Sequence, residues 1–144
     1  MLVRDVLTTK GDQVATIRPS ATVTDLVAAL AEHRVGALVV TSDDGNIEGI
    51  VSERDVARGL HTHGADLMAM PVSQVMTADV RTCVPGDAVR DIARTMTDGR
   101  FRHLPVLEDG RLAGIVSIGD IVKRRIDELE TEADQLVGYL STAQ

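Results

Sequence analysis

Cysteine and aromatic residues are nearly absent from this chain of 144 residues, which has one cysteine, one phenylalanine, one tyrosine and no tryptophan. A lone Cys83 excludes an intramolecular disulfide framework and a zinc site built on cysteines. Because Phe101 and Tyr139 are the only residues of the Phe, Tyr and Trp group, the chain must build its core from aliphatic side chains. We therefore expect a flat ligand to be held by valine, isoleucine and leucine rather than by ring stacking.

Long apolar runs and an excess of positive charge are also missing. No stretch reaches the ~20 apolar residues that a membrane-spanning helix needs. Arg4, Asp5 and Lys10 interrupt the apolar residues where a signal peptide would lie. The formal net charge is −7, whereas nucleic-acid binders normally present a basic surface. We therefore expect an intracellular, cytoplasmic protein with no membrane and no nucleic-acid partner.

An internal repeat organises the chain. The octapeptide at 49–56, Gly-Ile-Val-Ser-Glu-Arg-Asp-Val, returns at 114–121 as Gly-Ile-Val-Ser-Ile-Gly-Asp-Ile. Upstream matches at an offset of 66 pair residues 14–19 with 80–85, 23–30 with 89–96 and 35–40 with 101–106. The offset falls to 65 at the octapeptide because the first copy carries one extra residue before it, and such insertions belong in turns.

Each copy predicts the same order of elements. A short β run ends at Pro19 or Pro85, and an amphipathic helix follows with apolar residues three and four apart. Two β runs joined by an Asp-Gly turn come next, and the octapeptide leads into a second helix. We expect the first helix of each copy to be capped by Thr22 with Asp25 and by Asp87, respectively. The unit is therefore β-α-β-β-α.

A single copy of about 60 residues buries too little surface to be stable alone, so we expect the two copies to share one module. The predicted fold class is α+β, with two small sheets packed about a pseudo-two-fold axis. We place the first repeat at 1–62, a connector at 63–71 and the second repeat, with an extended C-terminal helix, at 72–144.

The last helix is longer than its counterpart and carries a heptad-like row of apolar residues. The spacing alternates between four and three along Val122, Ile126, Leu129, Ala133, Leu136 and Leu140. Two interpretations stay open. The row either packs on the chain's own domain or forms a contact with a second copy in a homodimer.

The repeated octapeptide has two interpretations as well. Ser-x-x-Asp ahead of an apolar run is a capping box, in which Ser52 or Ser117 accepts a hydrogen bond from a backbone N–H at the helix start. The same helix end suits a phosphate, and Asp55 or Asp120 has the carboxylate that binds ribose hydroxyls in dinucleotide folds. Glycine allows close backbone approach. The pattern therefore also predicts a nucleoside phosphate site, and capping and binding are compatible.

These motifs resemble the cystathionine β-synthase (CBS) domain, and the pair resembles a CBS pair, also called a Bateman module. The resemblance covers residues 3–126 and rests on the two octapeptides, Val75-Met76-Thr77 and Arg102-His103-Leu104-Pro105-Val106. CBS pairs usually bind adenosine-containing ligands in clefts between their repeats. The resemblance therefore implies AMP, ADP, ATP, NAD or S-adenosylmethionine as ligand, with Mg²⁺ only as a companion of ATP.

The resemblance also implies the site residues. Asp55 and Asp120 would hold ribose hydroxyls, with Ser52 and Ser117 beside the ribose-phosphate. The other candidate positions border the clefts, face the phosphates or recognise adenine through the backbone: Thr8, Gly36, Ala37, Arg54, Thr77, Val80, Arg81, Arg102 and His103.

The two copies are not equivalent at these positions. Two residue pairs differ: Gly36-Ala37 against Arg102-His103, and Glu53-Arg54 against Ile118-Gly119. An arginine attracts a phosphate, whereas a glutamate repels it. We therefore expect the two clefts to differ in affinity or ligand, or one of them to stay empty.

No nucleophile–base pair, Walker loop or cluster of metal ligands occurs in the sequence, so we expect neither an enzyme nor a resident metal. The leading hypothesis is a stand-alone regulatory protein that senses energy state or a metabolite through an adenosine-containing ligand and acts on a protein partner. The alternative is a structural or adaptor CBS protein that binds no ligand and regulates its partner by contact alone.

Overall fold

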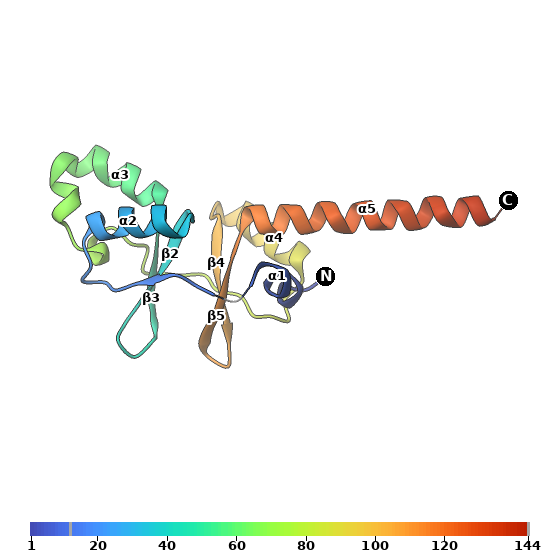
Figure 1. Ribbon diagram of the computed structural model, residues 1–144, viewed down its shortest axis with the longest axis horizontal. Helices are drawn as coiled ribbons and strands as arrows, with labels where there is room; N and C mark the ends of the chain where they lie inside the picture. Colours follow the sequence, from blue (N-terminus) through green and yellow to red (C-terminus); the bar gives the residue numbers. More distant parts are fainter. Residues whose placement is uncertain (12, 144) are drawn as a thin grey trace.

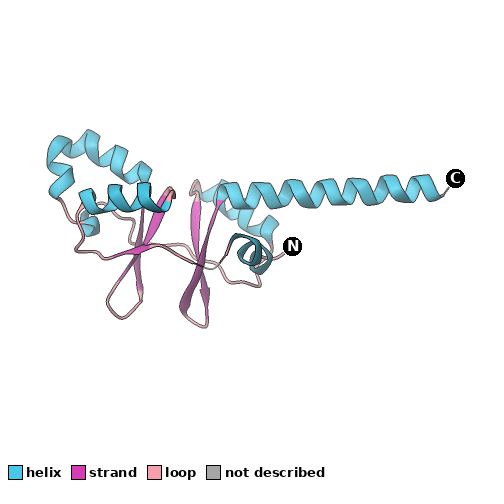
Figure 2. Cartoon of the chain, viewed as in Figure 1, coloured by secondary structure: helices cyan, strands magenta, loops and turns pink. Residues whose placement is uncertain are grey.

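The computed structural model describes residues 1–11 and 13–143 and shows a mixed α+β chain with two small sheets and a long terminal helix (Figure 1, Figure 2). The helices are α1 (Val3–Lys10), α2 (Val23–His33), α3 (Glu53–His63), α4 (Val89–Gly99) and α5 (Ile118–Thr142), with short 3₁₀ helices η1 (Gly64–Ala69) and η2 (Val72–Gln74). The strands are β1 (Thr16–Ile17), β2 (Ala37–Thr41), β3 (Ile47–Ser52), β4 (His103–Glu108) and β5 (Arg111–Ser117). The predicted fold class is confirmed.

The two sheets stand side by side in the middle of the molecule, with their helices on the outer sides (Figure 1). In the first sheet, β1 pairs parallel with β2, and β2 pairs antiparallel with β3. In the second sheet, β4 and β5 form an antiparallel hairpin. An isolated parallel bridge between Cys83 and Val106 stands where the first repeat has β1. The predicted β-α-β-β-α order is thus complete in the first repeat and shortened to a bridge at the start of the second.

Of the two cap predictions for the first helix of each repeat, one is confirmed and one is wrong. The Asp25 N–H donates to Thr22 Oγ1 at 3.2 Å, and the Thr22 N–H donates to Asp25 Oδ2 at 3.0 Å, so the predicted cap of α2 is confirmed. The predicted cap of α4 by Asp87 is wrong, because α4 begins after Ala88, whose side chain makes no capping bond. Asp87 instead accepts from the Val84 N–H at 2.9 Å and closes the turn before the helix.

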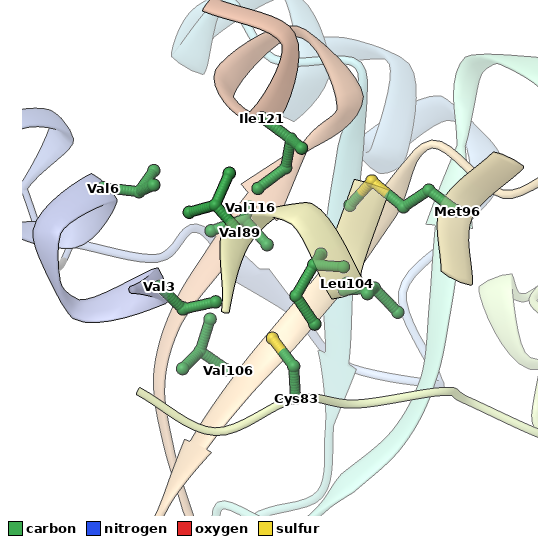
Figure 3. Close-up of a cluster of buried hydrophobic side chains, with 10 residues drawn as sticks. Val3, Val6, Cys83, Val89, Met96, Leu104, Val106, Val116 and Ile121 are labelled. Carbon is green, nitrogen blue, oxygen red and sulfur yellow. The ribbon is translucent and has the colours of Figure 1, made fainter. Parts of the chain in front are cut away.

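Two clusters of buried aliphatic side chains form the core, and each draws on both halves of the chain. Val3 and Val6 of α1 pack into the second repeat, beside Cys83 and Ile121 (Figure 3). Val72 of η2 packs into the first repeat, among side chains of α2, β2 and β3. Each repeat therefore holds the leading segment of the other one. This exchange fixes the two sheets relative to one another and positions the cleft between them.

The helix α5 projects far beyond the rest of the molecule (Figure 1). Its buried residue is Ile121, in the first turn. The apolar row farther along is half exposed or more, from 50% at Ile126 to 60% at Leu136. The interpretation that this row packs on the chain's own domain is therefore wrong, and the row remains available for another molecule.

Candidate functional site

The octapeptides form the same capping box in both repeats. In the first, the Ser52 N–H donates to Asp55 Oδ2 at 2.8 Å, and the Asp55 N–H donates to Ser52 Oγ at 3.4 Å. In the second, the corresponding distances between Ser117 and Asp120 are 2.9 and 3.1 Å. These bonds begin α3 and α5, so the capping interpretation is confirmed for both helices.

The first residue of each of these helices also forms a backbone hydrogen bond with the residue that precedes the hairpin. The Glu53 N–H donates to the Gly36 carbonyl at 3.0 Å, and the Ile118 N–H donates to the Arg102 carbonyl at 2.7 Å. Gly36 and Arg102 lie directly before β2 and β4, at matching positions of the two repeats. The positive ends of α3 and α5 therefore lie beside the starts of the central strands.

The glycine that opens each octapeptide lies under the leading segment of the other repeat. A Cβ on Gly49 would come 2.7 Å from Met76 Sδ and 2.7 Å from the Thr77 carbonyl oxygen. A Cβ on Gly114 would come 2.6 Å from Leu7 Cδ2. The close approach of a crossing segment therefore accounts for glycine at both positions, without any ligand.

A cleft of about 490 Å³ lies at the start of α3 and is lined by both repeats. We call it the first cleft, and its volume is within the ~300–1,000 Å³ of small-molecule sites. Phe101 is among its lining residues, so an aromatic ring borders this cleft, and the aliphatic grip on a flat ligand stays a prediction. The first cleft brings together ten of the candidate site residues: Gly36, Ala37, Ser52, Arg54, Asp55, Thr77, Val80, Arg81, Arg102 and His103.

The first cleft is rich in positive charge, although the chain has a formal net charge of −7. Three carboxylates line the cleft together with five arginines: Arg54, Arg58, Arg81, Arg100 and Arg102. All five arginines are exposed, and none takes part in an ion pair with another residue that the structure describes. Their guanidinium groups are therefore available to an anionic ligand, with a fork of donors that matches phosphate.

His103 reaches from the second repeat over Gly36 of the first. A Cβ on Gly36 would lie 3.6 Å from His103 Cε1 and 3.7 Å from Glu53 Oε2, so glycine leaves room for this imidazole. Burial lowers the pKa of His103. The positive charges of Lys10 and a neighbouring arginine lower it further, whereas the negative charges of Asp120 and Glu53 raise it by less. The imidazole is therefore neutral near pH 7, with one donor and one acceptor nitrogen.

Three candidate residues lie outside the first cleft. Ser117 and Asp120 begin α5, where Lys10 Nζ lies 2.6 Å from Asp120 Oδ2 and 3.0 Å from the Ile115 carbonyl oxygen. Burial would raise the pKa of Asp120, but hydrogen bonds from Lys10 and Ser117 outweigh it and hold that pKa below its usual value. Thr8 lies within α1, and its hydroxyl donates to the backbone of the same helix.

A family model of the CBS domain matches residues 3–62 and 72–127. The chain belongs to the CBS domain family. Each matched segment contains one copy of the octapeptide, so the predicted CBS pair is confirmed.

Known proteins resemble this CBS pair along most of its length. It is 36% identical over 123 residues to the mitochondrial CBS domain-containing protein CBSX3 of Arabidopsis thaliana, covering 83% of this chain but only 60% of that relative. A CBS-domain containing protein from Agrobacterium tumefaciens matches with a TM-score of 0.85 at 42% identity, over 87% of this chain and 99% of that one. The CBS domain pair of protein MJ0100, solved with 5′-methylthioadenosine and S-adenosyl-L-methionine, matches with a TM-score of 0.79 at 23% identity, over 89% of this chain and 98% of that one. This last likeness concerns the fold.

The described part of the CBS pair has neither a helix suited to crossing a membrane nor a cluster of metal ligands. None of its helices combines the length and apolar character that crossing a membrane requires. Within residues 1–11 and 13–143, no three histidine, cysteine or carboxylate side chains gather as metal ligands do.

Sequence reasoning missed several residues that the structure brings to the candidate site residues of this CBS pair. Arg58 follows Arg54 by four residues on α3, a spacing that places both on one helix face, so the signal was available. Arg100 ends α4 and reaches the first cleft because the chain turns there with a φ of 56°. Lys10 contacts Asp120 across 110 positions of the chain, and no local pattern indicates such a contact.

Proposed function

We propose that this CBS pair is a regulatory protein that binds an adenine nucleotide in the first cleft and passes the binding event to a protein partner. The observation that carries the proposal is the group of five exposed arginines at the start of α3. With three carboxylates opposite them, the lining has a net charge of +2 in a chain of −7. Guanidinium groups bind phosphate oxygens in pairs, and a helix N-terminus adds N–H donors.

We assign a role to each part of the first cleft. Asp55 accepts its capping bond at Oδ2, and its other carboxylate oxygen accepts from the ribose hydroxyls. The backbone near Val80 and Arg81 recognises adenine, beside the ring of Phe101. Arg54, with the other arginines and Ser52, holds the phosphates. The neutral His103 faces the same phosphates from the second repeat.

The charge of the first cleft separates the candidate ligands. AMP, ADP, ATP and NAD all carry phosphate, whereas S-adenosylmethionine carries a sulfonium cation that the arginines repel. The MJ0100 complex with 5′-methylthioadenosine and S-adenosyl-L-methionine supports adenosine recognition by a CBS pair. The arginine group favours the phosphate-bearing ligands for this chain, with Mg²⁺ accompanying ATP alone.

Calorimetric titration with AMP, ADP, ATP, NAD, adenosine and S-adenosylmethionine tests the proposal. We expect the phosphate-bearing ligands to bind and S-adenosylmethionine not to bind. Asp55→Ala should abolish binding, whereas Asp25→Ala, which removes the same capping carboxylate from α2, should lose only stability. Equal affinity in the two variants would refute the assignment of Asp55. If none of the ligands binds, the alternative of an adaptor without a ligand is the better account.

We also propose that the apolar row of α5 joins two copies of this chain as a homodimer. The row is exposed, and basic Lys123 and Arg124 precede acidic Glu130 and Glu132 along the helix. Two antiparallel α5 helices would therefore bring opposite charges together. Light scattering should find a dimer for the wild type and a monomer for Leu136→Glu. A monomeric wild type would contradict this contact.

The cytoplasmic location stays a prediction, and the Arabidopsis relative is named as mitochondrial. The absence of catalysis stays a prediction as well, because no product analysis bears on it. Incubation of the purified protein with ATP and Mg²⁺, followed by chromatography of the nucleotides, should show unchanged ATP.

A further inference from the structure

Glu53 is a carboxylate at the place where the proposed site holds phosphate. It is the first residue of α3 and stands between Ser52, which caps the helix, and Arg54. All three line the first cleft. The Glu53 N–H donates to the Gly36 carbonyl at 3.0 Å, so the backbone at this position is held against the start of β2. The carboxylate therefore enters the cleft from a fixed point.

The side chain of Glu53 reaches the space beside Gly36, where the two repeats meet. The position that a Cβ would take on Gly36 lies 3.7 Å from Glu53 Oε2 and 3.7 Å from His103 Nε2. The negative charge of Glu53 also raises the pKa of His103, against the larger effect of burial. Glu53 and His103 therefore border the same small region of the first cleft, one from each repeat.

The charge of Glu53 is not neutralised by any residue that the structure describes. Its side chain is exposed and forms no ion pair there, although five arginines line the same cleft. An acidic residue in the first turn of a helix is stabilised by the helix dipole. The helix start does not depend on it, however, because α5 begins with Ile118 after the same kind of capping box. The carboxylate of Glu53 is therefore free to act on a ligand.

We infer that Glu53 is a specificity-determining residue that lowers the affinity of the first cleft for ATP relative to AMP. This inference rests on the proposed function, in which Ser52, Arg54 and His103 surround the phosphates. A terminal phosphate carries a charge of about −2 near pH 7, and ATP carries about two more negative charges than AMP. The unpaired carboxylate repels the added charge, and an unpaired charge that opposes one of two ligands is a common source of specificity.

The arginines act in the opposite direction from Glu53. Each added phosphate gains attraction from the five guanidinium groups, so the arginines alone would favour ATP over AMP. Glu53 offsets part of this gain because it lies among the groups that hold the phosphates. Charges a few ångströms apart in a solvated cleft change an affinity on the order of tenfold. The ratio of the two affinities is therefore a sensitive measure of the role of Glu53.

Calorimetric titrations with AMP and with ATP, both without Mg²⁺, test the inference. Glu53→Gln keeps the size of the side chain and removes its charge, and it should raise the affinity for ATP relative to AMP about tenfold. Glu48→Gln removes the same charge from an exposed residue of β3 outside the cleft lining, and it should leave the ratio unchanged. A Glu53→Gln protein with the wild-type ratio overturns the inference.

Asp79→Asn separates the position of Glu53 from the total charge of the lining. Asp79 is an exposed carboxylate of the same cleft, next to the backbone that we assign to adenine. Its removal changes the charge of the lining by the same amount, so it should raise the affinities for AMP and ATP by similar factors. If Asp79→Asn shifts the ratio as much as Glu53→Gln does, the total charge sets the ratio and the inference is wrong.

Mg²⁺ distinguishes an effect of charge from an effect of size. The cation neutralises about two charges of ATP, so the gain in affinity from Glu53→Gln should be smaller for ATP with Mg²⁺ than for ATP alone. Equal gains under the two conditions would show that Glu53 acts through its shape and would overturn the inference. A loss of helix-dipole stabilisation in Glu53→Gln would affect AMP and ATP alike, so it cannot produce the expected change in the ratio.

The wild-type titrations separate this inference from the proposed function. If neither AMP nor ATP binds to the wild type, the proposed function fails, and the inference fails with it. If both nucleotides bind and Glu53→Gln leaves their ratio unchanged, the inference is wrong and the proposed function stands.

Discussion

At the scale of single residues, one long-range contact distinguishes the capping box of the second repeat from that of the first. Asp55 and Asp120 occupy identical capping boxes with similar distances. The Lys10 ammonium reaches Asp120, and its hydrogen bond helps to hold the Asp120 pKa below its usual value despite burial. Identical local chemistry therefore yields two different electrostatic sites.

Arg34 and Arg100 occupy matching positions at the ends of α2 and α4, with φ values of 55° and 56°. A side chain in this left-handed region is strained by roughly 1 kcal/mol relative to glycine. We therefore expect Arg34→Gly and Arg100→Gly each to raise the free energy of unfolding by up to about 1 kcal/mol in urea melts. Of the two, Arg100 lines the first cleft, so Arg100→Gly should also weaken ATP binding. Equal ATP affinity in both variants would contradict that role.

His103 predicts how stability depends on pH. Its pKa in the folded protein is below the ordinary value of 6.5, chiefly because it is buried. The unfolded chain therefore takes up this proton first, and the stabilisation is complete above pH 6.5 and is lost as the pH falls below it. Urea melts from pH 7.5 to 5 should show a steeper loss of unfolding free energy for the wild type than for His103→Gln. Parallel curves would argue against a depressed pKa.

At the scale of elements, the leading segment of each repeat packs in the other one. The helix α1 bonds to the second repeat through Val3 and Arg4, whose N–H groups donate to the carbonyls of Asp87 and Pro85 at 2.9 and 3.0 Å. The segment that ends in η2 bonds to the first repeat through the Val72 N–H and the Ala21 carbonyl, at 2.7 Å. Neither repeat is complete without the other chain half, so the first cleft depends on both.

The two octapeptide glycines should respond differently to a methyl group. An alanine at Gly49 meets the Thr77 carbonyl oxygen at 2.7 Å, which backbone bonds to Ile50 hold in place. An alanine at Gly114 meets a terminal carbon of the Leu7 side chain, which can rotate away. We expect Gly49→Ala to cost about 2–3 kcal/mol of unfolding free energy and Gly114→Ala about 1 kcal/mol. Chemical denaturation measures both, and the reverse order would contradict this account of the crossing segments.

At the scale of the whole molecule, the charge is unevenly distributed. The chain has 22 acidic and 15 basic residues, yet arginines outnumber carboxylates in the lining of the first cleft. If the proposed function holds, the acidic remainder of the surface repels a nucleotide, and the cleft attracts it.

This distribution predicts how binding depends on salt. Raising NaCl from 50 to 500 mM should weaken ATP binding on the order of tenfold, because the contacts to phosphate are exposed and charge-assisted. AMP, with one phosphate, should lose less affinity than ATP over the same change in salt. Calorimetry gives, for each nucleotide, the ratio of its dissociation constants at the two salt concentrations. Equal ratios for AMP and ATP would show that the arginines do not hold the outer phosphates.

The repeat, the β-α-β-β-α order and both octapeptide caps could be predicted from the sequence, because each depends on neighbours within a few residues. Among the candidate residues that meet in the first cleft, Ser52 and Asp55 could be predicted from the octapeptide. Positions such as Thr77, Val80 and Arg81 came from the family resemblance, which carries tertiary information that local patterns lack. The cap prediction for α4 is wrong because the Asp87 carboxylate accepts from the Val84 N–H in the preceding turn, and the helix begins one residue later, after Ala88.

The sequence by itself determined which residues begin α2, α3 and α5 and that the chain holds two copies of one unit, because capping and periodicity are local properties. The tertiary structure alone decided that five arginines converge on one cleft and that Lys10 reaches Asp120. Both depend on the exchange of leading segments between the repeats, which brings together residues as much as 110 positions apart. Contacts between residues so far apart along the chain depend on how the two cores pack.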